Sequence, residues 1–335
     1  LSCVSRRLLQ NQISAMSGFM GDAKIPVNEV SLPIRPPSED GEPERLLRVK
    51  QYNNTITTDA KSPTKQSARR ISGTSIKSFF SPLNGSVLMV HGSCASLEQY
   101  EKLVEILYPF LKKKNFVAEA FDAFGCGKSA KPKRTKAYAE RELQADLAAI
   151  YEKVKHPTTN FIIGHSYGTS QVIKLINEMS DEDKKAVKGV ILLSGAFPGT
   201  NGGHPIFILP SMFLDLIQGF LSSQFRAAAY HPTADPALLE AAADRSNANP
   251  MYMCKYFYEQ TKWATYDEIQ GVTCRTLVVH GEGDNILSLD AGRRLHSALP
   301  NASFKVMPNV SHQLMEEDPE TLANHIIEFM TESLK

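Results

Sequence analysis

The sequence lacks several features that would place it in a specialised class of protein. It contains no run of 18 apolar residues, so it predicts no transmembrane helix. Its 37 basic and 36 acidic residues leave a net charge of +1, which gives no field favouring nucleic acid as a partner. The five cysteines are scattered, without a C-x-x-C pair or a metal-ligand spacing. We therefore expect no metal site, and interpret the cysteines as core residues or as reduced thiols of an intracellular, cytoplasmic protein.

A complete phosphate-binding loop is also missing. Gly125-Cys126-Gly127-Lys128-Ser129 ends like a P-loop, but the pattern G-x-x-x-x-G-K-[ST] needs a glycine where Asp122 stands. Pro132 follows soon afterwards, which argues against the long helix that a P-loop precedes. We therefore expect no nucleotide at this loop.

The first 80 residues give weak signals. Residues 1–21 contain two arginines, several serines and no acid, a composition open to two interpretations: a mitochondrial or plastid transit peptide, or the disordered terminus that we favour. Residues 27–30 and 46–52 are candidate strands. Residues 45–77 carry eight basic residues and one acid, and we favour a solvated connector over a phosphate or membrane contact. Residues 1–80 are thus interpreted as a partly disordered extension that contributes first strands.

From residue 81 onward, short apolar segments alternate with amphipathic ones. The candidate strands, most of them apolar, lie at residues 87–90, 116–121, 161–163, 190–193, 276–280 and 303–307. Helical periodicity fills most intervals, notably residues 96–114, 137–154, 289–299 and 319–330. Strands without a polar face are typical of a parallel sheet covered on both sides. The sequence therefore predicts an α/β fold with a mostly parallel central sheet and helices on both faces.

The alternation stops between residues 198 and 263, where the pattern is helical without strand signals. We predict an inserted helical cap there, with the core formed by residues 81–197 and 264–335. One cap segment is strongly apolar and has three interpretations: the wall of an acyl pocket, a contact with a bilayer, or packing of the cap onto the core. We favour packing over membrane contact. Its apolar residues are Ile206, Phe207, Ile208, Leu209, Met212, Phe213, Leu214, Leu216, Ile217, Phe220 and Leu221.

The pentapeptide Gly164-His165-Ser166-Tyr167-Gly168 reads G-x-S-x-G and lies where an apolar strand gives way to a helical pattern. A serine at such a sharp turn needs small neighbours, and the two glycines leave room where a Cβ would collide. The following helix also directs unpaired N–H groups towards developing negative charge. The segment predicts a nucleophile elbow, with a chance match in a loop as the alternative.

Two later strand ends supply partners for Ser166. Asp284 and then His312 complete the order Ser, Asp, His that this fold uses. Because a serine hydroxyl is a weak nucleophile, we expect His312 to accept its proton and Asp284 to hold the imidazole in the right tautomer. The backbone N–H groups of Ser93 and Tyr167 would bind the oxyanion. Taken singly, Asp284 also suits a turn or helix cap, and His312 also suits a surface loop.

Two further histidines receive structural interpretations. Alternation along the elbow is expected to point His165 away from Ser166, so we assign it to packing. His280 lies inside a predicted strand and is expected to be a core histidine.

Together these motifs resemble the α/β-hydrolase superfamily, specifically serine hydrolases of the abhydrolase-domain type, over residues 80–335. The matching segments are His91-Gly92, Asp122 with residues 124–129, residues 164–168, residues 279–284, and Ser311-His312 followed by Glu316, Asp318 and Pro319. Some relatives of this kind use an aspartate nucleophile for epoxide or halide chemistry. Ser166 implies ester, thioester or amide chemistry instead.

The resemblance implies a serine hydrolase that cleaves a carboxylic ester, with a lipid as one candidate, through an acyl-enzyme and without a cofactor. Peripheral membrane contact stays open. Two alternatives also stay open, because the fold alone does not fix the activity. One is an acyltransferase that uses the same three residues, and the other is a binding protein that uses the pocket as a receptor.

Overall fold

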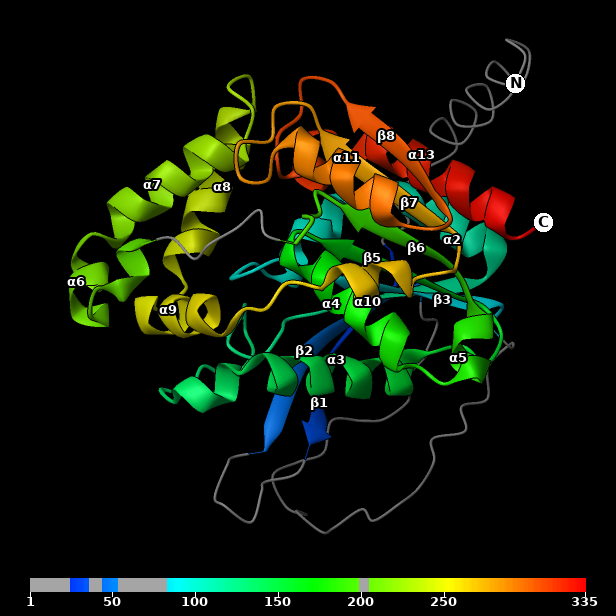
Figure 1. The fold of residues 1–335 in the computed structure, drawn as a ribbon, viewed down its shortest axis with the longest axis horizontal. Coiled ribbons are helices and arrows are strands. Elements are labelled where there is room, and N and C mark those ends of the chain that lie inside the picture. Colours follow the sequence, from blue (N-terminus) through cyan, green and yellow to red (C-terminus); the bar gives the residue numbers. More distant parts are fainter. Residues whose placement is uncertain (1–24, 36–43, 54–82, 199–204) are drawn as a thin grey trace.

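The computed structural model describes residues 25–35, 44–53, 83–198 and 205–335, and its centre is a sheet of eight strands (Figure 1). The order across the sheet is β1-β2-β4-β3-β5-β6-β7-β8. β1 pairs antiparallel with β2, and β2 pairs antiparallel with β4, whereas all the other pairs are parallel. The predicted mostly parallel sheet is therefore confirmed. The strands are β1 Val27–Arg35, β2 Arg45–Tyr52, β3 Gly85–Val90, β4 Phe116–Phe121, β5 Asn160–His165, β6 Val187–Leu193, β7 Thr276–Gly281 and β8 Ala302–Met307.

The central strands are mostly apolar because both faces of the sheet are covered. In β6, Val190 and Leu192 belong to one hydrophobic layer, and Ile191 and Leu193 belong to the other. All four side chains are fully buried, and each such burial stabilises the fold by roughly 1.5–3 kcal/mol. Period-two alternation is therefore present in the structure although the sequence shows only a continuous apolar run.

Helices cover both faces. α2 Glu101–Lys114 and α13 Pro319–Ser333 contribute to one hydrophobic layer, whereas α3 Glu140–Val154, α4 Tyr167–Glu178 and α11 Leu289–Ala298 contribute to the other. Shorter elements complete the core: η1 Leu97–Tyr100, η2 Thr135–Tyr138, α5 Asp181–Ala186, α10 Tyr266–Gln270 and α12 Leu314–Glu317. The predicted helix over residues 137–154 begins later than expected because Ala139 is extended, with φ −56° and ψ 139°. None of the described helices is both long and apolar enough to cross a bilayer.

The helical segment between β6 and β7 projects to one side of the sheet (Figure 1). It consists of η3 Pro205–Ile208, α6 Ser211–Leu216, α7 Gln218–Ala229, α8 Pro236–Asn247 and α9 Met251–Gln260. Its own small core contains Ala229, Tyr230 and Ala242. α9 joins it to the central domain through Phe257, whose ring meets the edge of Tyr167 at 5.9 Å between centroids. We call this segment the cap.

The favoured prediction that the apolar cap segment packs onto the core is wrong for six of its eleven residues. Leu214 is fully buried and four others are half-buried, but the exposed fractions of the remaining six range from 41% at Leu209 to 83% at Leu216. Only part of the segment packs against the core, because α6 is short and buries a single side chain, that of Leu214. The exposed residues are Ile208, Leu209, Met212, Phe213, Leu216 and Phe220.

Both candidate strands near the beginning of the chain are present as β1 and β2. They form the antiparallel edge of the sheet, so this part of the extension belongs to the core. The transit-peptide interpretation of residues 1–21 and most of the basic connector lie outside the described residues.

Candidate active site

Ser166 sits on a sharp turn between β5 and α4. Its φ of 52° and ψ of −123° are unusual for a residue with a side chain and indicate backbone strain. The turn is held by the Ser166 N–H, which donates to the Leu193 carbonyl at 2.9 Å. A Cβ on Gly164 would lie 2.7 Å from the Gly168 carbonyl oxygen, so the strand and the helix approach too closely for a larger residue. The expected strand-turn-helix arrangement is observed.

Asp284 and His312 are brought together at the ends of β7 and β8. Nδ1 of His312 lies 2.8 Å from Oδ2 of Asp284, and both side chains are buried. Oδ1 of Asp284 accepts the N–H groups of Ile286 and Leu287 at 2.9 and 2.8 Å. Burial alone would raise the pKa of Asp284, but the charge and hydrogen bonds of His312 and His280 outweigh it and hold the pKa well below its usual range. The ionised carboxylate therefore fixes the proton on Nδ1 of His312 and leaves Nε2 as an acceptor.

Ser166, His312 and Ser93 all line one cavity of about 720 Å³ between the sheet and the cap. The loop after β3 lies directly against the serine, because a Cβ on Gly92 would come 2.9 Å from Cβ of Ser166. Tyr167 is the first residue of α4, so its N–H has no partner within the helix. Much of the remaining lining is apolar: Ile206, Phe207, Leu221, Phe225, Ala228, Trp263 and Ile286.

His165 faces the site, contrary to the expectation that it points away. Its Nε2 donates to the backbone carbonyl of His312 at 3.0 Å, and the two ring centroids are 4.8 Å apart. Nδ1 must then be an acceptor, which Nε2 of Gln99 approaches to 3.3 Å. Burial, reinforced by the charge of His312, lowers the pKa of His165 and keeps the ring neutral. The strained turn at Ser166 breaks the alternation on which the expectation relied.

The loop that carries His312 is held from two sides. The Glu317 carboxylate accepts the N–H groups of Ser311 and Gln313 at 3.1 and 3.2 Å. The His312 N–H donates to the Ala229 carbonyl in the cap at 3.0 Å. The cap and α12 therefore position the histidine that the β8 strand presents.

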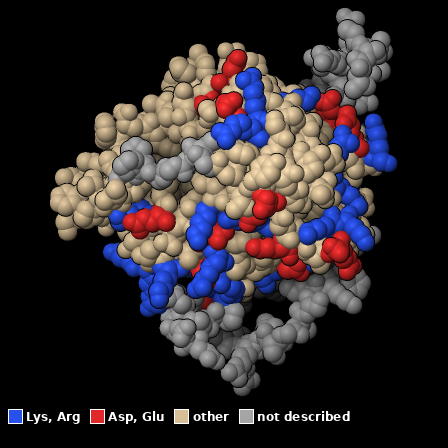
Figure 2. Space-filling view, viewed as in Figure 1, with Lys and Arg blue, Asp and Glu red and all other residues tan. Residues whose placement is uncertain are grey.

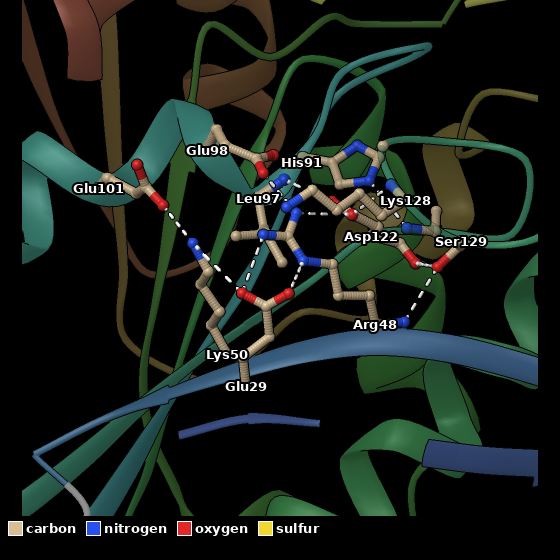
Figure 3. Close-up of polar contacts among 12 residues, drawn as sticks. Glu29, Arg48, Lys50, His91, Leu97, Glu98, Glu101, Asp122, Lys128 and Ser129 are labelled. Atoms are coloured by element: carbon tan, nitrogen blue, oxygen red, sulfur yellow. Dashed lines mark hydrogen bonds and ion pairs between the residues drawn. The ribbon is translucent and has the colours of Figure 1, made fainter. Parts of the chain in front are cut away.

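The loop carrying Ser93 rests on a buried ion network that Figure 3 shows. Arg48 on β2 pairs with Glu29 at 2.8 Å, with Asp122 at 3.2 Å, and with Glu98. Asp122 in turn accepts the N–H of Leu97 at 2.8 Å, which anchors the far end of the loop. Its near end is anchored by His91, which donates from Nδ1 to the Gly92 carbonyl at 2.7 Å and accepts the Ala123 N–H at 2.9 Å.

The segment that resembled a P-loop closes on a carboxylate of the protein itself. The Lys128 N–H donates to Oδ2 of Asp122 at 2.8 Å, and the Ser129 hydroxyl donates to the Asp122 carbonyl at 2.7 Å (Figure 3). A short 3-10 turn, η2, follows instead of a long helix. The residue that broke the sequence pattern is therefore the residue around which this loop folds.

Sequence reasoning missed a polar cluster in the cavity. The Glu316 carboxylate accepts hydrogen bonds from the Tyr230 hydroxyl and from Arg245 of the cap. Burial raises the pKa of this carboxyl group. All three residues line the cavity. Tyr230 and Arg245 lie in no recognisable sequence motif, because the packing of the cap decides which of its residues reach the cavity. Within the described ranges, no group of three or more His, Cys, Asp or Glu side chains has the arrangement of a metal site.

Comparisons with known proteins bear on the family and the fold. A family model described as serine aminopeptidase, S33, matches residues 81–319. Protein ABHD8 of Homo sapiens is 26% identical over 251 residues, which are 73% of this chain and 54% of the relative. The chain thus spans about half the length of that relative. The uncharacterized hydrolase YugF of Bacillus subtilis is 22% identical over 74% of this chain and 91% of the relative.

Among solved structures, a thermophilic esterase from Thermogutta terrifontis superposes with a TM-score of 0.68 at 17% identity, covering 92% of this chain and all of the esterase chain. This likeness confirms the α/β-hydrolase fold. Because the family model covers well over half of the sequence, the chain belongs to the S33 serine aminopeptidase family of α/β hydrolases.

Proposed function

We propose that the protein is a serine hydrolase that cleaves carboxylic esters through an acyl-enzyme. The observation that carries the proposal is that the strained Ser166 and His312, which is hydrogen-bonded to Asp284, line the same cavity. Membership in a hydrolase family and the likeness to esterases support it. No cofactor, nucleotide or nucleic acid is required by this chemistry.

In the proposed reaction, Oγ of Ser166 attacks the ester carbonyl carbon while Nε2 of His312 accepts the hydroxyl proton. The oxyanion accepts hydrogen bonds from the N–H groups of Ser93 and Tyr167, each worth about 3 kcal/mol of barrier. The imidazolium, stabilised by Asp284, then gives its proton to the departing alcohol. Water repeats the sequence on the acyl-enzyme and releases the acid.

The substrate class that fits the cavity is an ester with an apolar acyl chain, such as a lipid ester. The cap contributes Ile206, Phe207, Leu221 and Phe225 to the lining, so an acyl chain would lie between the cap and the sheet. The Glu316 and Arg245 side chains provide hydrogen-bonding groups in the same space for the polar part of the ester.

The decisive variant is Ser166→Ala. We expect it to lose turnover of short and long p-nitrophenyl esters and to lose labelling by a fluorophosphonate, which reacts quickly only with an activated serine. Ser93→Ala is the matched control, because it removes a hydroxyl from the same cavity but keeps the backbone N–H proposed to act. Full turnover by Ser166→Ala would overturn the proposal.

The same assays separate the alternatives. A receptor that only keeps the fold would bind an ester without turnover and would resist the fluorophosphonate. An acyltransferase would form the acyl-enzyme and give more ester than acid when an acceptor alcohol is added. The family description names aminopeptidases, so turnover of an aminoacyl p-nitroanilide in preference to esters would move the proposal to amide bonds.

A further inference from the structure

Six large apolar side chains of the cap lie on its outer surface. They are Ile208, Leu209, Met212, Phe213, Leu216 and Phe220, and we call them the cap apex. Within the described ranges, they are six of the ten exposed large hydrophobic residues, although they come from a segment of 13 residues. This clustering is much denser than scattered surface hydrophobics, and such patches mark contacts with membranes or other proteins.

The cap apex adjoins apolar residues that line the cavity. Ile206 and Phe207 line the cavity, and Ile208 directly after them is 82% exposed. In α7, Leu221 and Phe225 line the cavity, whereas Phe220 faces outwards. A hydrocarbon chain leaving an apolar phase at the apex would therefore reach Ser166 along apolar side chains. Asp215 is the single charged residue between positions 205 and 225.

A basic loop flanks the cap apex on the other side of α9. It contains the exposed residues Lys128, Lys133, Arg134 and Lys136, and no acid occurs between residues 123 and 139. α9 contacts η2 of this loop, and it also contacts α6 and η3 of the apex. On the face drawn in Figure 2 the projecting end of the cap shows no charged side chain, an acidic group lies beside its base, and basic side chains gather below.

Two contacts fix the loop to α9, and two fix the apex side to the same helix. The Tyr252 hydroxyl donates to the Lys131 carbonyl at 2.6 Å, and Nζ of Lys133 lies 5.5 Å from the Tyr252 ring centroid. On the apex side, Phe207 stacks on Tyr258 with centroids 4.5 Å apart, and Nζ of Lys255 donates to the Leu209 carbonyl at 3.0 Å. The apolar and basic surfaces are therefore parts of one packed unit.

We propose that the cap apex inserts into the surface of a bilayer that contains anionic phospholipid, with the basic loop against the headgroups. The apolar residues supply burial in the acyl boundary, and the basic residues supply attraction to anionic headgroups. Such an arrangement places the cavity entrance at the membrane. The inference concerns binding and does not depend on the proposed ester chemistry.

The test measures co-sedimentation of the full chain carrying Ser166→Ala, so that binding is separate from turnover. Vesicles of phosphatidylcholine with phosphatidylserine are compared with vesicles of phosphatidylcholine alone. We expect binding to the mixed vesicles that weakens as salt rises. Replacing Phe213, Leu216 and Phe220 with serine should reduce it at least about tenfold. Replacing Lys133, Arg134 and Lys136 with glutamine should reduce it by about 100-fold, because each basic residue near an anionic surface contributes about fivefold.

Control variants replace exposed apolar or basic side chains that lie outside the cap apex and the basic loop. Val306→Ser removes an exposed apolar residue on β8, and Lys112→Gln with Lys113→Gln removes exposed charges on α2. Both should bind like the parent. The apex and loop variants should keep the circular dichroism spectrum and the unfolding temperature of the parent, which shows that they fold. Absence of vesicle binding, or binding that survives the apex substitutions, would overturn the proposal. Self-association that the apex substitutions abolish, without vesicle binding, would instead assign the patch to a contact between copies of the chain.

Discussion

Nε2 of His280 lies 2.7 Å from the Leu287 carbonyl oxygen and 3.3 Å from Oδ2 of Asp284. A carbonyl oxygen can only accept, so Nε2 carries a proton, and this N–H group lies within ion-pair distance of the carboxylate. Asp284 is therefore next to a second imidazole N–H besides that of His312. The sequence assignment of His280 to the core is confirmed by its complete burial, but its contact with Asp284 adds a positioning role.

Removing that donor should slow the proposed reaction without weakening substrate binding. We expect His280→Leu to lower kcat about tenfold and to leave KM unchanged, because a hydrogen bond to a charged group contributes about 1.5–3 kcal/mol. His280→Gln keeps an N–H donor and should restore most of the rate. A purely structural role would reduce the yield of folded protein and leave kcat per folded molecule the same in both variants.

The close approach of Gly92 to Ser166 gives a second prediction. A Cβ at residue 92 would lie 2.9 Å from Cβ of Ser166 and 3.3 Å from Nδ1 of His165. Gly92→Ala should therefore displace the serine, and a displacement of about 1 Å can cost about 100-fold in rate. The measurement is the rate of fluorophosphonate labelling.

Gly219→Ala provides the control for that variant. Gly219 lies in α7 and has no atom within 4 Å of the added Cβ, so labelling should not change and the helix should gain up to about 1 kcal/mol. Equal labelling rates in both variants would show that the loop after β3 does not constrain Ser166.

The sequence was sufficient for the mostly parallel sheet and for placing Ser166, Asp284 and His312 after strands, because the carboxyl ends of parallel strands meet at one edge. It was insufficient for His165, whose direction depends on the positive φ of Ser166. It was also insufficient for the cap, because apolar composition is the same for Leu214, which is buried, and Leu216, which is exposed. Contacts such as Arg245–Glu316 depend on how the cap sits on the core, which no local pattern records.

The ion network below the Ser93 loop should matter for stability. Arg48 is 4% exposed and Asp122 is fully buried, so Arg48→Met would leave a buried carboxylate without its counter-charge. Such a loss typically costs about 3–5 kcal/mol. We expect a corresponding fall in the free energy of unfolding, measured with urea.

Lys50→Met is the matched variant on the same strand. Lys50 pairs with Glu29 and Glu101, whose side chains are 44% and 41% exposed, so its loss should cost about 1 kcal/mol or less. If the two substitutions lowered the free energy of unfolding equally, the ion network around Asp122 would contribute no more to stability than the exposed ion pairs of Lys50.

Glu119 on β4 should make stability depend on pH. Its carboxyl is buried beside Gln51, whose Nε2 donates to Oε1 at 3.2 Å, and burial raises its pKa to about 8. Between the unfolded pKa of about 4.3 and the folded value, the native state binds more protons than the unfolded state, so stability falls as pH rises through this window and levels off above it.

Glu119→Gln imitates the protonated form. We therefore expect the variant and the parent to have the same free energy of unfolding near pH 4. Towards pH 8 the variant should become increasingly more stable, by an amount on the order of a few kcal/mol. Glu105→Gln, on the exposed face of α2, controls for loss of one charge, and a Glu119→Gln curve parallel to that of the parent would mean that Glu119 is ionised in the folded protein.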